Sequence, residues 1–317
     1  MTPVEAFSAA RDVITSGLAT RAFPAAAIDV GRRSGPLWRE AFGRLTYAPD
    51  AAPCDLETIF DLASLTKVIA TATAAMRLVE AGRLTLDQRV GDMRPPWRAS
   101  GRDAVTVRHL LDHSSGLPAH VRFWEHARGR EAVGGVPLDH QFAGVASTVP
   151  EPVLYRPGPD LTSRIAPTED DPWRGHVLRG EVHDENAAAL GGVAGHAGLF
   201  GTAGGVAAFA RLVLETFERP TILVSPALMR LFAARTGVPD SSRALGWDTM
   251  RPASSCGTRL SPTAIGHTGF TGTSLWIDHE RDLYVVFLTN RVHPTRSNEQ
   301  LAALRPRVHD AIVEGLG

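Results

Sequence analysis

Apolar residues recur at helical spacing near both ends of the chain. Between Pro3 and about Thr20 they fall three or four positions apart, which predicts one amphipathic helix. A second helix of this kind is predicted from about Ser297 to Glu314. Both ends of the chain are therefore expected to be helical.

Strand patterns lie just inside these helices. Ala25–Gly31 and Leu37–Gly43 flank a Ser-Gly-Pro turn, which predicts a hairpin. Thr273–Asp278 and Leu283–Asn290 predict a second hairpin near the other end. Between about Leu84 and Gly205 we find helical pieces and loops but no alternating strand pattern.

These elements predict an α+β fold. A sheet built from both chain ends would be antiparallel and flanked by the terminal helices, with a mostly helical domain between its halves. We expect residues 1–60 and 206–317 to form the discontinuous sheet domain. Residues 61–205 would then form the mostly helical domain.

The most informative helix begins near Asp61, which we predict to be its N-cap, and ends at Gly82 in the C′ position. This places Ser64 in the first turn and Lys67 one turn later. Residues three apart on a helix share a face, so the hydroxyl and the amine can meet. The helix N-terminus adds free N–H groups and positive potential around Ser64.

Composition draws attention to the same helix. Lys and Arg together number 33, yet Lys67 is the only lysine in the chain. A guanidinium stays charged, whereas an ammonium loses its proton when it is buried or lies near other cations. We therefore predict that Lys67 works partly as a neutral amine, which would accept the Ser64 proton during nucleophilic attack.

A second candidate segment precedes the C-terminal hairpin. His267, Thr268 and Gly269 are followed by Phe270, and the small residues would let a substrate lie along the strand edge. His267 would place a titratable group beside the site.

Charge and length exclude other classes of function. A net charge of −1 gives no basic field for nucleic acid or an anionic membrane, and no apolar run is long enough for a membrane span. The N-terminus lacks a secretory pattern, so we expect a cytoplasmic protein, or a periplasmic or secreted one whose leader was removed. The expected partner is a small-molecule substrate, without a cofactor or a metal; the pattern does not indicate an oligomeric state.

Several polar and aromatic residues allow two interpretations. The spacing of His176, His183, Asp184, Glu185 and His196 matches no zinc motif, so a hydrogen-bonded loop is favoured over a metal site. His113 is interpreted as a turn residue after a helix over Val107–Asp112, not as part of a second catalytic pair. Three tryptophans either wall an apolar cleft or pack in the core: Trp97, Trp124 and Trp173.

Four blocks of sequence carry a family resemblance: Ser64–Lys67, Leu110–Leu117, Gly198–Ala203 and His267–Gly269. In this order they resemble the serine β-lactamase-like proteins, in the branch of class C β-lactamases, D-Ala-D-Ala carboxypeptidases and family VIII carboxylesterases. The resemblance implies the β-lactamase/DD-peptidase-like fold and an acyl-enzyme mechanism.

By this resemblance Ser64 would be the nucleophile and Lys67 its proton partner. The N–H groups of Ser64 and Phe270 would form the oxyanion hole. His267, Thr268 and Gly269 would line the substrate strand.

The chain departs from the family at a third motif, Tyr-x-Asn, whose tyrosine helps to move the proton. Only three tyrosines are present, and Tyr155 is followed by Arg156 and Pro157, without the expected asparagine. We infer that some tens of residues carrying the motif are missing near Val133–Gly134. They are absent from the natural gene, deleted, or left out of this sequence.

Two functions follow from these patterns. The first is a serine hydrolase that acts through an acyl-enzyme on small esters, β-lactams or D-amino-acid amides. The second is a catalytically impaired binding or scaffold protein that keeps the fold. The absent tyrosine motif favours the second, and the retained Lys67 favours the first.

Overall fold

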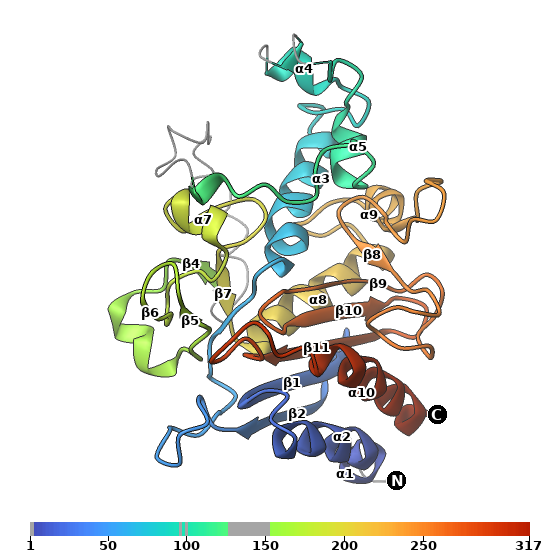
Figure 1. The fold of residues 1–317 in the computed structure, drawn as a ribbon. Coiled ribbons are helices and arrows are strands. Elements are labelled where there is room, and N and C mark those ends of the chain that lie inside the picture. The colour runs from blue at the N-terminus through green and yellow to red at the C-terminus, as the bar shows by residue number, and fades with distance from the viewer. Residues whose placement is uncertain (1–2, 95–96, 99–100, 126–152) are drawn as a thin grey trace.

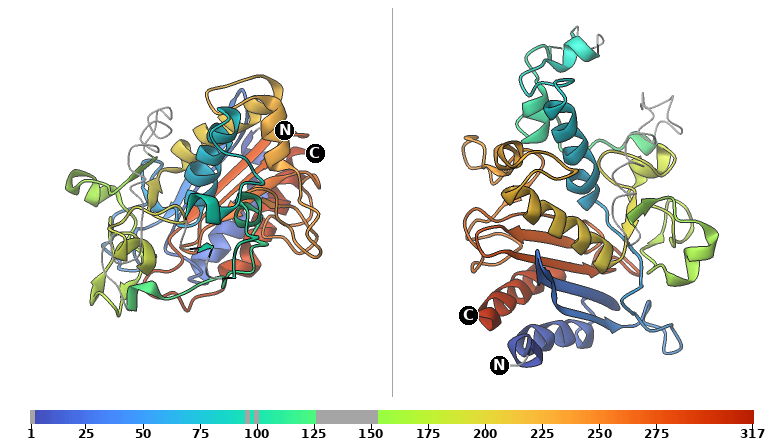
Figure 2. Two further views of the ribbon diagram at one scale, coloured as in Figure 1. Left: turned by 90° about the horizontal axis from the view of Figure 1, so that it is seen from above. Right: turned by 180° about the vertical axis from the view of Figure 1, so that it is seen from behind.

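The computed structural model describes residues 3–94, 97–98, 101–125 and 153–317. Both chain ends contribute to a layered region in which helices cover a sheet, and the middle of the chain rises above it (Figure 1). The two termini lie near each other on the same side of this sheet (Figures 1 and 2).

The sheet has six strands in the order β2-β1-β11-β10-β9-β8, and every neighbouring pair is antiparallel. Strands β1 and β11 pair with Ile28 opposite Phe287, and this pairing joins the two ends of the chain. Both predicted hairpins are confirmed, as is the α+β class. The strands are β1 (Ala25–Arg32), β2 (Gly35–Gly43), β8 (Asp248–Thr249), β9 (Ile265–Thr268), β10 (Ser274–Asp278) and β11 (Leu283–Thr289).

Helices cover both faces of this sheet because side chains alternate between the faces along each strand. In β1, Ala26 and Ile28 pack in one core with α2 (Ser8–Ala19) and α10 (Leu301–Leu316). Ala25 and Ala27 face the opposite core with α8 (Ala203–Glu218). The terminal helices therefore lie on one face and α8 on the other (Figure 2).

The terminal helices differ from the expected spans. The predicted helix from Pro3 to Thr20 is two helices, α1 (Pro3–Ala6) and α2, separated at Phe7. Phe7 has non-helical dihedral angles and is buried, with its ring stacked on Trp38 at a centroid distance of 5.1 Å. The C-terminal helix begins at Leu301, four residues later than expected. In the segment before it, the Asn298 side chain donates a hydrogen bond to the Arg21 carbonyl (2.8 Å).

The middle of the chain contains short strands that the sequence pattern does not reveal. β3 (Phe60–Asp61), β7 (Leu199–Gly201) and β4 (Val153–Tyr155) form a three-stranded sheet, and β5 (Asp170–Asp171) pairs with β6 (His176–Val177). The expectation of no strand in this stretch is wrong, because two or three residues are too few for an alternating pattern.

Short helices complete the structure. Gly82 ends the serine helix as predicted: its φ is +65°, and its N–H donates to the Val79 carbonyl (3.0 Å). The remaining helical elements are a π-helical segment (Lys67–Ala72), α3 (Thr73–Glu80), α4 (Val90–Met93), α5 (Val107–Leu111), α7 (Glu185–Ala189), α9 (Pro226–Ala233) and two 3₁₀ turns (Phe123–Glu125 and Pro159–Arg164).

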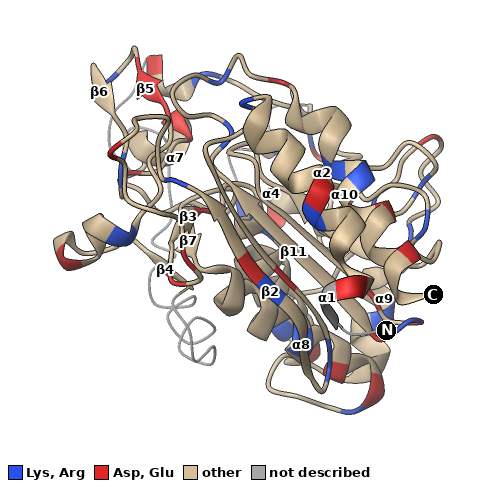
Figure 3. Ribbon diagram, turned by 90° about the horizontal axis from the view of Figure 1, so that it is seen from below, with Lys and Arg blue, Asp and Glu red and all other residues tan. Residues whose placement is uncertain are grey.

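Charged residues of both signs are mixed over the side that carries α2, β2 and α10 (Figure 3). Of the helices in the described ranges, none combines the length and the apolar character that crossing a bilayer requires.

Candidate active site

A tight turn leads from β3 into the serine helix. The prediction that Asp61 is the N-cap of this helix is wrong, because Asp61 lies in β3 and the helix begins beyond Ser64. Its buried carboxylate instead accepts the N–H groups of Ala63 (2.8 Å) and His183 (2.7 Å). Ala63 adopts a left-handed conformation with φ of +46°, which places Ser64 directly before the helix.

Ser64 and Lys67 meet at the start of the helix. The distance between Ser64 Oγ and Lys67 Nζ is 2.7 Å, and Nζ also donates to the carbonyl of His196 (3.1 Å). Burial lowers the pKa of Lys67 to about 8; the negative charge of Asp184 opposes this shift and the positive charge of Arg243 adds to it. An amine with this pKa is partly neutral near neutral pH.

The end of β9 approaches the serine turn closely. Thr271 Oγ1 donates to the Asp61 carbonyl (2.7 Å), and Thr273 Oγ1 donates to the Leu62 carbonyl (3.1 Å). Gly269 lies at the same contact, and a Cβ on this residue would stand only 2.7 Å from the Leu62 carbonyl oxygen. The contact therefore needs a glycine, and it brings the predicted substrate strand beside Ser64.

His267 on β9 is buried next to a guanidinium. Its Nε2 lies 3.2 Å from Arg243 Nη1, and its Nδ1 lies 2.8 Å from the Thr268 carbonyl. Because arginine only donates, Nε2 must accept and Nδ1 carries the proton. Burial, with further help from Arg243 and Lys67, lowers the pKa of His267 to about 3, so the imidazole is neutral at pH 7.

Phe270 lies two residues after the end of β9 and is half exposed. Its ring stacks on His183 (5.6 Å between centroids), and the Arg291 guanidinium lies 4.8 Å from its centroid. The backbone N–H groups of Ser64 and Phe270 have no acceptor within the described ranges of the chain. Both donors are thus available to a bound oxyanion.

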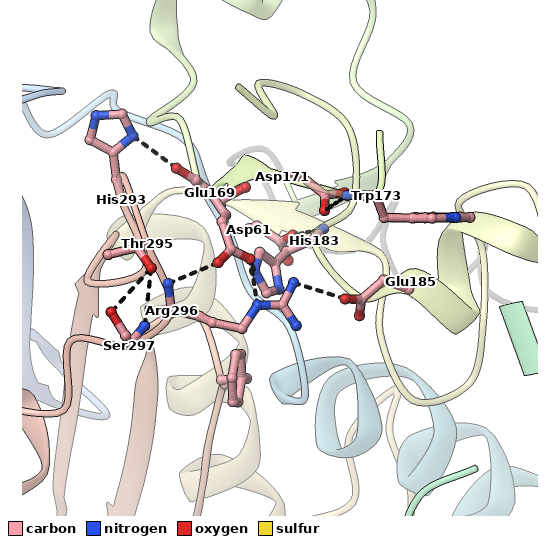
Figure 4. A network of polar contacts seen from close by, with 12 residues as sticks. Asp61, Glu169, Asp171, Trp173, His183, Glu185, His293, Thr295, Arg296 and Ser297 are labelled. Carbon is pink, nitrogen blue, oxygen red and sulfur yellow. Dashed lines mark hydrogen bonds and ion pairs between the residues drawn. The ribbon is translucent and has the colours of Figure 1, made fainter. Parts of the chain in front are cut away.

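A polar network supports this side of the site (Figure 4). Glu169 accepts hydrogen bonds from His183 (3.0 Å) and from the Arg296 side chain (2.5 Å), and Arg296 also pairs with Glu185 (2.8 Å). Although burial raises the pKa of Glu169, these bonds lower it to about 2. The prediction of a hydrogen-bonded loop fits this network, and Asp184 likewise pairs with His196 (2.9 Å). No three ligand-type side chains cluster as a metal site in the parts of the chain with described coordinates.

Sequence reasoning misses Arg243, whose charge acts on Lys67 from a segment far along the chain and which no local pattern marks. It interprets Asp184 and His196 as part of a hydrogen-bonded loop, but it does not predict that they lie near Lys67. His113 follows α5 with a φ of +61°, as expected for a turn residue. Partial burial together with the charges of Arg243 and Lys67 lowers its pKa, so it also lies within the electrostatic field of the site.

For three tryptophans the sequence leaves two interpretations open, the wall of an apolar cleft or packing in the core. Trp124 and Trp173 contact each other with centroids 4.9 Å apart, and Trp97 lies near Arg102. None of the three belongs to the buried cores.

All three tyrosines lie in described segments. The Tyr155 hydroxyl donates to the Ala194 carbonyl (3.3 Å), two residues before the carbonyl that Lys67 contacts. Tyr47 donates to the Arg21 carbonyl, and Tyr284 donates to the buried Asp29 (2.8 Å). Val133–Gly134, where we infer the omission, lies outside the described residues.

Comparison with known proteins places this fold in one class, that of the β-lactamase-related proteins. The family model described as "Beta-lactamase" matches residues 10–147 and 152–309. The chain belongs to the β-lactamase family, as the four sequence blocks predict.

Curated relatives cover most of the chain. An N-acetylmuramyl-L-alanine amidase of Bacillus subtilis (strain 168) is 30% identical over 303 aligned positions, which cover 74% of this chain and 68% of that protein. A putative D-alanyl-D-alanine carboxypeptidase of Escherichia coli (strain K12) is 28% identical and covers 77% of this chain and 71% of its own length.

The first of these alignments contains more positions than this chain contributes, since 74% of 317 residues is well below 303. In total, the relative therefore carries some tens of aligned residues without a counterpart here. This total is of the size expected for the inferred omission.

Solved structures agree on the fold. EstCE1, a hydrolase with promiscuous acyltransferase activity, superposes with a TM-score of 0.72 at 19% identity and covers 98% of this chain and 99% of its own. A class C β-lactamase from Rhodobacter sphaeroides superposes with a TM-score of 0.70 at 20% identity. The superposition covers 98% of this chain and 100% of the β-lactamase chain.

Proposed function

We propose that this protein is a serine hydrolase that works through an acyl-enzyme, with Ser64 as nucleophile and Lys67 as its base. The observation that carries the proposal is the 2.7 Å distance between Ser64 Oγ and a half-buried Lys67 Nζ. Hydrolase relatives such as the carboxypeptidase and the amidase support the same reaction class.

The reaction begins when the neutral Lys67 amine accepts the hydroxyl proton as Ser64 Oγ attacks a carbonyl carbon. The negative charge that forms on the carbonyl oxygen is stabilised by the N–H groups of Ser64 and Phe270. The ammonium of Lys67 then returns its proton to the departing group, which leaves the acyl group on Ser64. Water releases the acyl group in a second, analogous step.

Arg243 supports a choice among the expected substrates. The guanidinium contacts His267 on the substrate strand, and no carboxylate of the described chain forms an ion pair with it. A guanidinium is well suited to bind a carboxylate. We therefore favour substrates that carry a carboxylate, as β-lactams and peptides ending in a D-amino acid do, over small neutral esters.

A substrate panel tests the proposal. Nitrocefin, a peptide ending in D-Ala-D-Ala and a p-nitrophenyl ester are offered to the wild type and to Ser64→Ala. We expect turnover that Ser64→Ala abolishes, and in Arg243→Gln a higher KM for the carboxylate substrates than for the ester. Turnover that persists in Ser64→Ala would refute the role of Ser64.

The alternative is a binding or scaffold protein that keeps the fold without turnover. It is favoured by the aligned residues of the amidase that have no counterpart in this chain, a difference that fits a chain without the Tyr-x-Asn segment. If the wild type neither turns over a substrate nor forms an adduct on Ser64, this alternative replaces the hydrolase.

A further inference from the structure

Three successive carbonyl groups before β7 accept hydrogen bonds from side chains around the serine helix. The Ala194 carbonyl accepts from Tyr155 (3.3 Å), that of Gly195 from Thr71 (2.5 Å) and that of His196 from Lys67 (3.1 Å). This loop is therefore held beside the serine helix, and the Lys67 amine contacts it.

The side chain of His196 is directed toward Asp184. Its Nε2 lies 2.9 Å from Asp184 Oδ1, and the same oxygen accepts the N–H of Ala187 at the start of α7 (2.8 Å). Asp184 is thus fixed at the N-cap of α7, and through His196 it holds the loop that contacts Lys67.

The contact with His196 has a consequence for the amine. A neutral amine has two N–H bonds and one lone pair, and the His196 carbonyl takes one of the N–H bonds. Ser64 Oγ lies 2.7 Å away, where the lone pair can receive its proton. The position of the His196 carbonyl therefore helps to decide whether Lys67 is oriented as a base.

Charge links the same groups. The positive charge of Lys67 helps to lower the pKa of Asp184, and Asp184 raises the pKa of Lys67. Among the described residues, Asp184 is the acidic side chain whose charge acts on Lys67. The charged and titratable groups that face the amine are Asp184 at the start of α7, His196 before β7, Arg243 before β8, His113 after α5 and His267 on β9.

We propose that Asp184 and His196 are positioning residues for Lys67. The pair holds the His196 carbonyl against the amine, and the Asp184 carboxylate stabilises the ammonium that forms when Lys67 takes the proton of Ser64. The role of Asp184 and His196 in the reaction rests on the proposed function. The electrostatic coupling of Asp184 to Lys67 does not.

The single lysine makes a direct test possible. In protein grown with lysine ¹³C-labelled at Cε, Lys67 gives the one lysine signal of the chain, and its chemical shift reports the pKa during a pH titration. Asp184→Asn removes the charge and keeps a side chain that caps a helix. We expect the pKa of Lys67 to fall by about half a unit or more, because an opposite charge is lost.

Two further variants control the measurement. Asp50→Asn removes an exposed turn carboxylate whose charge does not act on Lys67, and it should leave the signal unchanged. His196→Ala should raise the pKa of Lys67, because the Asp184 carboxylate loses the side chain that donates to it and its negative charge then acts more strongly on the amine. This opposite shift decides the matter even if Asp184→Asn does not fold. A pKa of Lys67 that stays at the wild-type value in folded Asp184→Asn or in the His196 variant would overturn the inference.

Labelling with a fluorophosphonate separates this inference from the proposed function. If Ser64 is not labelled but the two pKa shifts appear, the hydrolase proposal fails and the coupling stands. If Ser64 is labelled and the pKa of Lys67 does not move, only the positioning role is lost.

Discussion

Lys67 is the residue on which the chemistry depends, because it combines a short contact to Ser64 with burial that lowers its pKa to about 8. Its place could be predicted from the sequence, since a three-residue spacing at a helix start is local. Arg243 and Asp184 could not, because only the folded chain brings them near the amine.

Replacing Lys67 by arginine tests the role of a neutral amine. Arginine keeps the positive charge but does not release a proton near neutral pH. We expect Lys67→Arg to slow acylation of Ser64 by about 10²–10⁴-fold while the circular dichroism spectrum stays that of the wild type. Acylation at the wild-type rate would refute proton acceptance by Lys67.

The rate of acylation should depend on pH through the same group. The pKa of Lys67 is lowered to about 8, so the active neutral form is lost as pH falls through that value. We expect the rate to decrease about tenfold per pH unit below it and to level off above it. The measurement is the rate of fluorophosphonate labelling from pH 5 to 10, and a rate independent of pH over this range would contradict the assignment.

At the scale of elements, the close contact between the serine turn and the end of β9 forms the site. The sequence predicts both hairpins and the end of the serine helix at Gly82, because these depend on local patterns. It does not predict β3 or β7, whose two or three residues become strands only through distant partners. Nor does it predict the break at Phe7, which depends on packing against Trp38.

Gly269 is the position where this contact is most sensitive. A Cβ there would lie 2.1 Å from Thr273 Oγ1 and 2.7 Å from the Leu62 carbonyl oxygen. We expect Gly269→Ala to separate β9 from Ser64, with at least a tenfold loss of acylation rate and a free energy of unfolding lower by about 1–3 kcal/mol.

Gly237→Ala is the matched control, because nothing lies within 4 Å of a Cβ at that exposed position. Urea unfolding and labelling rates compare the two variants. Equal behaviour of both would show that the approach of β9 to the serine turn does not matter.

At the scale of the whole molecule, the sheet separates the core of the terminal helices from the core beneath the site. Ile312 in α10 is fully buried on the side away from Ser64. We expect Ile312→Ala to lower the free energy of unfolding by about 2–5 kcal/mol and to leave the labelling rate of the folded protein unchanged.

Arg307→Ala, an exposed position in the same helix, should change the stability by no more than about 0.5 kcal/mol. Denaturant unfolding gives both values. A selective loss of labelling in folded Ile312→Ala would mean that the two cores are not separated in function.

The central claim is that Ser64 becomes acylated, and the most direct measurement is the mass of the labelled peptide. The wild type and Ser64→Ala are incubated with a fluorescent penicillin or a fluorophosphonate, digested and analysed by mass spectrometry. The account predicts one adduct, on Ser64 of the wild type, and none in Ser64→Ala. An adduct on another residue, or labelling that persists unchanged in Ser64→Ala, would contradict it.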